Sequence, residues 1–205
     1  MAAPEGLRAR RRRETAREIH LAALRLTRQH GFDVATVEAI SAEAGIAPRT
    51  FFNYFPSKEA AVVHGPFDLD QADVSAFTGG ATVSYAELLT ELVELLAANL
   101  AADPPSRDEL HDVFAVSQEH PGVLAAMLAQ LEGFQRRVAE LVAVRLNRPA
   151  DDEEATLIAA LALTILRAGF DRWVHEAAEP ARTPAADIAH VAALMNDMFG
   201  DRHEH

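Results

Sequence analysis

Apolar residues recur at every third or fourth position through most of the chain, which is the spacing of amphipathic α-helices, and no stretch alternates as a β-strand does. The first such stripe contains Ile19, Ala22 and Leu26 and ends at Gly31-Phe32. A glycine followed by an apolar residue is typical of a helix C-terminus. The pattern therefore predicts an all-α protein, in which we count about nine helices.

Two short helices joined by a glycine turn are predicted next. Thr36 is a candidate N-cap, and Val37, Ile40 and Ala44 follow at i, i+3 and i+7, which gives one apolar stripe. Gly45 can adopt the left-handed conformation that ends a helix. These signals predict a short helix that stops at a tight turn.

The second short helix is expected to have a buried and an exposed face. Pro48 suits its first turn, where a missing N–H costs nothing, and Pro56 ends it. Phe51 and Phe55 lie four positions apart and are expected to face inward. The positions left toward the outside or the rim are Arg49, Thr50, Phe52, Asn53 and Tyr54. A further helix, with Lys58 in its first turn, is expected to follow.

Longer helices are predicted after a broken helix and loop over residues 65–83. A Ser that precedes a Glu by three positions forms a capping box, and two of these helices open in this way: Ser84 with Glu87 and Ser106 with Glu109. Asp151 and Glu154 open another long helix. We expect helices over residues 84–102, 106–119, 121–146, 151–178 and 183–199, the last closed by Gly200.

Charge is distributed unevenly along the chain. The net charge is −12, yet residues 1–58 contain nine arginines and Lys58, the only lysine, against six acidic residues. A basic end on an acidic body concentrates attraction for a polyanion at that end. Within the run from Arg10 to Arg13, Arg10 and Arg12 are candidates to reach phosphates or a minor groove. The alternative for this run is a solvated tail.

The pattern T-x-x-x-I-S-x-x-A-G-I-A-x-x-T-F-F-x-Y-F-x-S-K-E over residues 36–59 resembles the DNA-binding domain of TetR-type repressors, and the resemblance covers residues 13–64. It implies that the helix beginning at Pro48 reads base edges while its neighbours hold phosphates. The implied DNA-binding residues are Thr36, Pro48, Arg49, Thr50, Phe52, Asn53, Tyr54 and Lys58, with Arg10 and Arg12 from the arm. Side-chain chemistry agrees, because Arg can bond guanine bidentately, Asn can bond adenine, and Lys and helix N-terminal amides attract phosphate.

The later helices resemble a C-terminal group that includes the mycofactocin-system regulator and is linked to acyl-CoA-like ligands. The resemblance rests on the segment from His120 to Leu146 and on Leu157 to Trp173. A ligand cavity needs an apolar lining with a few polar groups. The candidate ligand-binding residues are His111, Phe114, Gln118, Met127, Leu131, Phe134, Arg167 and Trp173. The alternative is ordinary core with solvated polar residues.

The last two helices are predicted to form a homodimer interface. Residues 151–178 leave little of their helix polar, and Ile188, Leu194 and Met198 belong to an apolar stripe on the final helix. A helix that is apolar on most sides must be buried on several. The alternative is that both helices belong to the core of a monomer.

Several classes of function are not supported by the sequence. Cysteine is absent, so disulfides and thiolate metal sites are excluded. The arginine run is followed by charged residues rather than an apolar h-region, and no apolar run has transmembrane length, so we expect a cytoplasmic protein. No catalytic motif is present, and Asp171 with His175 resembles a solvated helix end more than a cation site. We therefore expect no enzymatic activity, no cofactor and no metal.

The sequence predicts four segments: a flexible basic arm (1–12), a helix-turn-helix domain (13–64), a helical effector-binding and dimerisation domain (65–200) and a tail (201–205). The leading interpretation is a dimeric, sequence-specific repressor that a small apolar effector releases from a palindromic DNA operator. Two alternatives are a DNA-binding regulator without an effector and a small-molecule-binding helical protein that lacks DNA binding.

Overall fold

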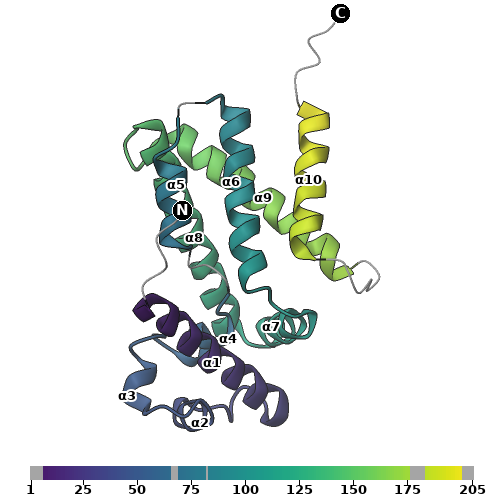
Figure 1. Cartoon of the computed structure of the whole chain (residues 1–205). Coiled ribbons are helices and arrows are strands. Elements are labelled where there is room, and N and C mark those ends of the chain that lie inside the picture. The colour runs from purple at the N-terminus through teal and green to yellow at the C-terminus, as the bar shows by residue number, and fades with distance from the viewer. Residues whose placement is uncertain (1–6, 66–68, 82, 176–182, 200–205) are drawn as a thin grey trace, which may run out of the picture. The chain divides into compact units, whose positions relative to one another are not determined.

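A computed structural model describes residues 7–65, 69–81, 83–175 and 183–199. Every regular element in these ranges is a helix, which confirms the predicted all-α class. The helices, labelled in Figure 1, are α1 (Leu7–His30), α2 (Val37–Glu43), α3 (Pro48–Phe51), α4 (Lys58–Val62), α5 (Gln71–Thr78), α6 (Tyr85–Ala102), α7 (Arg107–Glu119), α8 (Pro121–Leu146), α9 (Glu153–His175) and α10 (Pro184–Phe199).

The described residues form ten helices rather than about nine. Two separate short helices, α4 and α5, lie where the sequence predicted a helix with Lys58 in its first turn and then a broken helix and loop over residues 65–83. Ser57 caps α4 and Asp70 caps α5, each by accepting a bond from a backbone N–H two or three positions later. Two N-caps explain the extra helix, because each cap satisfies the amides of a new helix start.

Most helix ends lie where local signals predict them. Gly31 and Gly45 have φ values of 84° and 68°, the left-handed conformation expected at the ends of α1 and α2. Both predicted serine capping boxes, at Ser84 and Ser106, have their reciprocal hydrogen bonds. No helix among the described residues is long and apolar enough to cross a membrane.

Two helix starts differ from the prediction. Helix α1 begins at Leu7 rather than near residue 13, so Arg10 and Arg12 lie in its first turns and not in an extended arm. Asp152, not Asp151, caps α9, because its Oδ1 accepts from the N–H of Ala155 at 2.9 Å. The expected end of α9 near residue 178, Gly200 and the tail lie outside the described residues. The domain boundaries remain predictions.

The chain divides into two compact units, and α8 contributes to both. Among the described residues, the head unit consists of residues 7–65 and 105–132, and the body unit of residues 69–81, 83–104, 133–175 and 183–199. In the head unit, α1 packs against α2, α4 and α7. The core of the head unit includes Ile19, Ile40, Phe51, Val62 and Val123.

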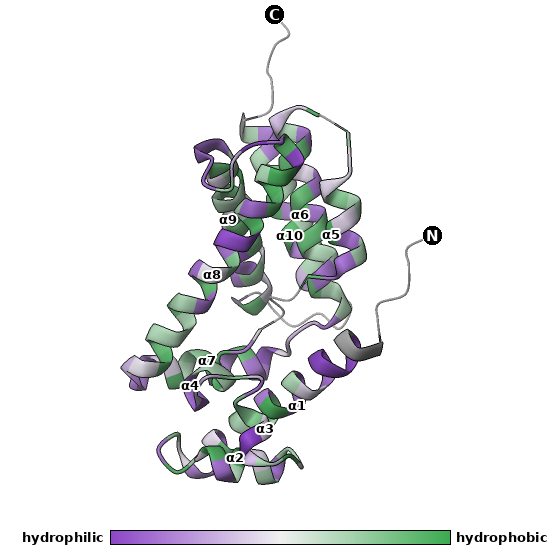
Figure 2. Ribbon diagram, turned by 90° about the vertical axis from the view of Figure 1, so that its left-hand side faces the viewer, coloured by the Kyte–Doolittle hydropathy of each residue, from purple (hydrophilic) through white to green (hydrophobic). Residues whose placement is uncertain are grey.

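In the body unit, α6, α9 and α10 pack on one another, and α5 packs on α6. Figure 2 shows hydrophobic residues along α6 and α10. Helices α9 and α10 approach closely at Gly169, where a Cβ would lie 2.5 Å from Ile188 Cα. The Arg145 side chain, 4% exposed, bonds Ala81 O at 3.0 Å and Phe77 O, and pairs with Glu91 at 2.8 Å. This arginine satisfies carbonyls at and after the end of α5.

Candidate nucleic-acid interface

The candidate interface begins at helix α2, which local signals fix at both ends. Thr36 Oγ1 accepts a bond from the N–H of Ala39 at 3.2 Å, as an N-cap does. After α2, the Ile46 N–H donates to Ser41 O at 2.9 Å, which closes the glycine turn. Thr36 is also exposed, so the residue that caps α2 remains accessible to solvent.

Helix α3 has the buried and exposed faces that the sequence predicted. Phe51 is fully buried and Phe55 is 4% exposed, whereas Phe52 between them is 58% exposed. Pro48, Arg49 and Asn53 are also exposed, and Thr50 and Tyr54 are half-buried. The regular helix ends at Phe51, but the Phe55 N–H still bonds Phe51 O at 3.0 Å. The six predicted reading residues therefore lie on one short helix and the turn after it.

Arg12 connects helix α1 to the end of this reading segment. Its Nη2 donates to Asn53 O at 3.0 Å, and its Cζ lies 5.0 Å from the centroid of the Tyr54 ring. Arg10, two positions earlier, pairs with Glu14 at 2.8 Å within α1. Both arginines are exposed, but Arg12 contacts the reading segment directly. The sequence contained no signal for this contact, which spans 41 positions.

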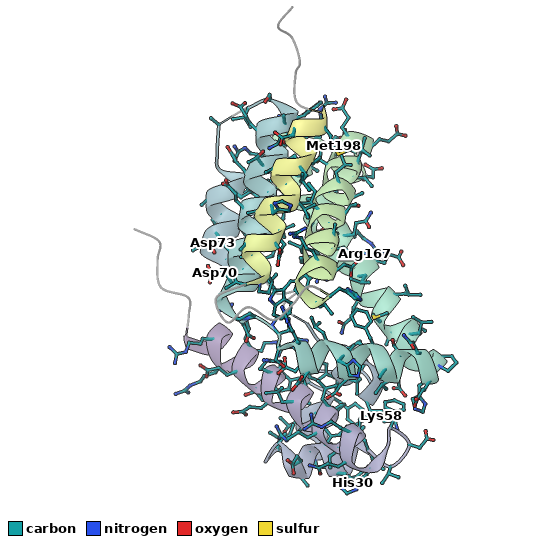
Figure 3. The ribbon with its side chains drawn as sticks, turned by 90° about the vertical axis from the view of Figure 1, so that its right-hand side faces the viewer. His30, Lys58, Asp70, Asp73, Arg167 and Met198 are labelled. Atoms are coloured by element: carbon teal, nitrogen blue, oxygen red, sulfur yellow. The ribbon has the colours of Figure 1, made fainter. Side chains whose placement is uncertain are left out.

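Lys58 also contacts the protein itself. Its Nζ donates to Phe32 O at 2.7 Å and lies 4.1 Å from the centroid of the Phe32 ring. The side chain is half-buried, and Figure 3 labels it on the head unit. An ammonium group has three N–H donors, so this bond leaves donors for a phosphate. The predicted phosphate contact of Lys58 thus remains a prediction.

Two ion pairs that no local sequence signal predicted connect helix α7 to α1. Arg17 bonds both carboxylate oxygens of Glu109 at 2.9 Å, and Arg28 lies 3.7 Å from Asp112. Glu109 also closes the capping box of α7. The capping box could be predicted from the sequence, but the second partner of Glu109, Arg17, is 92 positions away and left no local signal.

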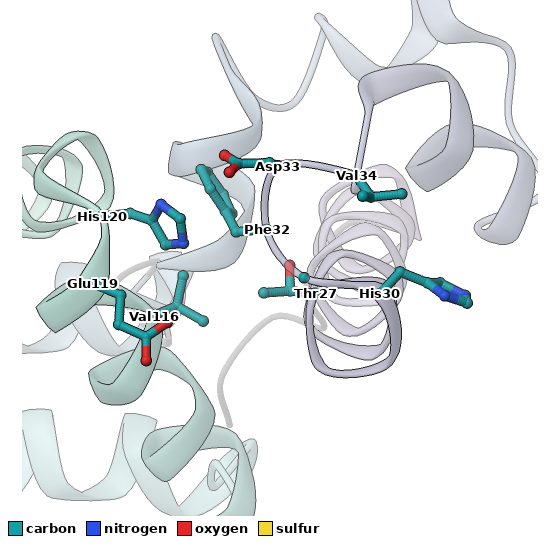
Figure 4. Close-up of a pocket in the computed structure, with 9 residues that line it drawn as sticks. Thr27, His30, Phe32, Asp33, Val34, Val116, Glu119 and His120 are labelled. Carbon is teal, nitrogen blue, oxygen red and sulfur yellow. The ribbon is translucent and has the colours of Figure 1, made fainter.

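A surface hollow of about 330 Å³ lies in the head unit at the ends of α1 and α7 (Figure 4). It is lined by Thr27, His30, Gly31, Phe32, Asp33, Val34, Val116, Glu119 and His120. The rings of Phe32 and His120 stack in a tilted geometry with centroids 4.7 Å apart. No predicted ligand-binding residue lines this hollow.

The predicted ligand-binding residues divide between the two units. His111, Phe114, Gln118, Met127 and Leu131 belong to the head unit. Phe114 and Leu131 are each 46% exposed, and His111 and Gln118 are exposed. Met127 instead packs against the core of the head unit.

The other three predicted ligand-binding residues belong to the body unit. Phe134 and Trp173 are buried there, at 3% and 8% exposure. Arg167, labelled on α9 in Figure 3, is 84% exposed at its side chain and lies 3.8 Å from Asp171. Because the set spans both units, a common cavity remains a prediction.

Comparison with known families gives two matches. Residues 19–62 match the family model described as "Bacterial regulatory proteins, tetR family", and residues 86–199 match that of the MftR C-terminal domain. The HTH-type transcriptional regulator TcmR of Streptomyces glaucescens is 29% identical over 157 residues, which cover 72% of this chain and 67% of TcmR. The putative mycofactocin biosynthesis transcriptional regulator MftR of Mycobacterium tuberculosis is 26% identical over 167 residues, covering 82% of this chain and 83% of MftR.

Solved structures share the fold at low sequence identity. The fatty acid degradation regulator FadR from Bacillus halodurans is 22% identical, with a TM-score of 0.50 over 93% of this chain and 97% of that one. A putative TetR-family transcriptional regulator from Mesorhizobium loti is 19% identical, with a TM-score of 0.55 over 91% and 96%.

Proposed function

This chain belongs to the TetR family of bacterial regulatory proteins, and we propose that it acts as a dimeric repressor that a small apolar effector releases from its operator. Proteins of this family are transcriptional regulators that bind DNA, so duplex DNA is the partner. The observation that carries the proposal is the surface of α3 and of the turn after it, where Arg49, Phe52 and Asn53 are exposed while Phe51 and Phe55 are buried.

The exposed side chains suit direct reading of a major groove. Arg49 has a guanidinium that can bond guanine bidentately, Asn53 has an amide that can bond adenine, and Phe52 offers an apolar contact for a thymine methyl. Thr36 and Lys58 lie at the first turns of α2 and α4, where backbone amides also attract phosphate. Pro48, Thr50 and Tyr54 complete the proposed surface, and Arg10 would add a phosphate contact.

Dimerisation through α9 and α10 is supported by apolar side chains that one chain leaves exposed. Leu157 and Leu161 on α9 are 60% and 41% exposed, and Leu194 and Met198 on α10 are 46% and 69% exposed. Each pair is spaced by four positions and therefore lies on one face of its helix. A two-fold dimer would bury these faces and present two α3 helices to a palindromic operator.

An elongated apolar effector of the acyl-CoA-like class is a narrower part of the proposal. Leu124, Leu128 and Leu131 lie at i, i+4 and i+7 on α8 and therefore share one face of that helix. These leucines are 40%, 56% and 46% exposed, and Phe114 on α7 is also 46% exposed. The effector would lower operator affinity only by its differential affinity for the DNA-bound and free conformations. No catalytic role is proposed for this chain.

Selection of bound duplexes from a random DNA library, followed by a salt titration on the enriched sequence, tests the proposed operator binding. We expect a palindrome with half-sites about one helical turn apart, ~34–36 Å, and binding that weakens steeply with salt. Arg49→Ala should cost ~1–3 kcal/mol and relax one base position, whereas Lys58→Ala should weaken binding to all sequences. No enriched sequence at low salt would contradict the proposal.

The effector is tested with the selected operator as probe. Acyl-CoA thioesters and fatty acids of increasing chain length are titrated into the complex, and release is followed by fluorescence anisotropy. Release that strengthens with chain length supports an apolar effector, and Leu128→Asp should abolish it while operator binding persists. If no compound acts, the regulator without an effector becomes the better interpretation.

A further inference from the structure

The turn that follows α3 carries part of the proposed reading surface, yet it lies beyond the regular helix. Helix α3 is assigned only from Pro48 to Phe51, and Asn53 and Tyr54 belong to the turn after it. Carbonyl groups at a helix C-terminus lack partners within the helix and must find them elsewhere. A side chain on such a turn is oriented well only if the backbone beneath it is held.

Arg12 supplies two contacts to consecutive residues of this turn. The edge of its guanidinium donates to Asn53 O at 3.0 Å, and its Cζ lies 5.0 Å from the Tyr54 ring centroid. A guanidinium can use both modes together, because its N–H groups lie in its plane and its face is available for stacking. One contact holds the backbone of Asn53, and the other holds the ring of Tyr54.

A similar arrangement supports the other end of the helix-turn-helix segment. Lys58 donates to Phe32 O at 2.7 Å and lies 4.1 Å from the Phe32 ring, in the turn that precedes α2. In each case a cation from a different helix bonds the carbonyl of a turn and lies against an aromatic ring of that turn. Cations near the segment therefore fix its turns as well as contributing charge.

We propose that Arg12 is a positioning residue, which orients Asn53 and Tyr54 for base reading, rather than a phosphate-contacting residue. This inference rests on the proposed DNA interface for its functional consequence, but the contact itself can be tested without DNA. Arg11 provides the matched control, because it is exposed, carries the same charge, and lies one position away on α1. Within the described residues, no contact of Arg11 with the turn after α3 is seen.

The first experiment measures amide hydrogen exchange of the free full-length protein for the wild type, Arg12→Ala and Arg11→Ala. The amides of Asn53, Tyr54 and Phe55 donate to Thr50 O and Phe51 O at 2.9–3.0 Å and report directly on the turn. Arg12→Ala should speed their exchange roughly three- to tenfold, the effect expected from losing a weak, exposed cation contact and its bond. Arg11→Ala should leave them unchanged. Equal exchange in the two variants would overturn the proposal.

The second experiment compares affinity for the selected operator with affinity for an unrelated duplex of equal length. A lost phosphate contact weakens both equally and lowers the salt slope by ~0.9. Arg12→Ala should instead weaken operator binding more than unrelated binding, so that the specificity ratio falls relative to Arg11→Ala. An equal loss on both duplexes would identify Arg12 as a phosphate contact and overturn the proposal. If the wild type binds no operator, the proposed function fails, and hydrogen exchange still decides whether Arg12 holds the turn.

Discussion

Helices α1 to α4 and the pair α9–α10 bury their apolar faces to very different extents. In α1–α4, Ile19, Ile40, Phe51 and Val62 are at most 1% exposed, so these helices contribute to a core that closes within one chain. In α9 and α10, leucines and Met198 remain exposed in the same chain, although both helices also contribute buried residues. Helices α1–α4 are therefore suited to present polar side chains over a packed core, whereas α9 and α10 have apolar surface left for a partner.

Substitutions at Phe51 and Phe52 test the buried and exposed faces of helices α1–α4 and should have the largest effect. Phe51→Ala empties a fully buried position and should cost ~3–5 kcal/mol of unfolding free energy. Phe52→Ala removes a ring that is 58% exposed and should change stability by less than ~1 kcal/mol while weakening operator binding. Urea denaturation followed by circular dichroism measures the two changes in unfolding free energy. Similar losses for the two variants would contradict the assigned faces of α3.

A substitution at Leu157 tests whether the exposed apolar face of α9 belongs to a dimer interface. Leu157→Glu places a charge on the exposed apolar face of α9 and should raise the dimer dissociation constant about 10- to 100-fold, or ~1.4–2.8 kcal/mol. Thr156→Glu, at an exposed polar position on the same helix, is the matched control and should leave the dimer intact. Sedimentation equilibrium measures both constants. An unchanged dimer in Leu157→Glu would place the interface elsewhere.

The glutamates of the two capping boxes differ in their contacts: Glu109 also binds Arg17 on α1, whereas Glu87 does not. Comparing the same substitution at both positions separates the contribution of the box from that of the ion pair. Glu109→Gln keeps a residue that can close the box of α7 but removes the charge that binds Arg17, and should cost about 1 kcal/mol. Glu87→Gln makes the same change in the box of α6, where Glu87 bonds only Ser84 in the described contacts, and should cost less than Glu109→Gln because no ion pair is lost. Equal costs in urea denaturation would show that the Arg17 pair adds nothing.

The smallest effect concerns pH. Hydrogen bonds from the Ser84 backbone N–H and then its hydroxyl lower the pKa of Glu87 below its ordinary value of 4.5. A carboxyl whose pKa is lower in the folded state contributes stability above the unfolded pKa and loses it as pH falls through the folded pKa. The stability difference between wild type and Ser84→Ala should therefore shrink as the pH is lowered from 6 toward 3. A stability difference that stays constant over this range would argue against a stabilising bond between Ser84 and the ionised Glu87 carboxylate.

Much of the fold and one face of the candidate site were predictable because their signals are local. The glycines at 31 and 45 and the serine capping boxes act within about four residues, so the sequence locates these helix ends directly. The inward positions of Phe51 and Phe55 follow from helical spacing alone and are confirmed. The two caps that divide α4 from α5 were local as well, but the Asp70 cap was not identified.

Sequence patterns alone predicted the all-α class, the helix-turn-helix segment, the exposed positions of α3 and of the turn after it, and the excess of positive charge in residues 1–58. The three-dimensional structure was needed to show that residues 105–132 pack with the N-terminal helices, that Glu109 binds Arg17 across 92 positions, and that Arg12 contacts Asn53 across 41. The reason is physical: caps and turns are satisfied by neighbouring backbone groups, whereas a long cationic side chain can find its acceptor on any element that the fold brings near.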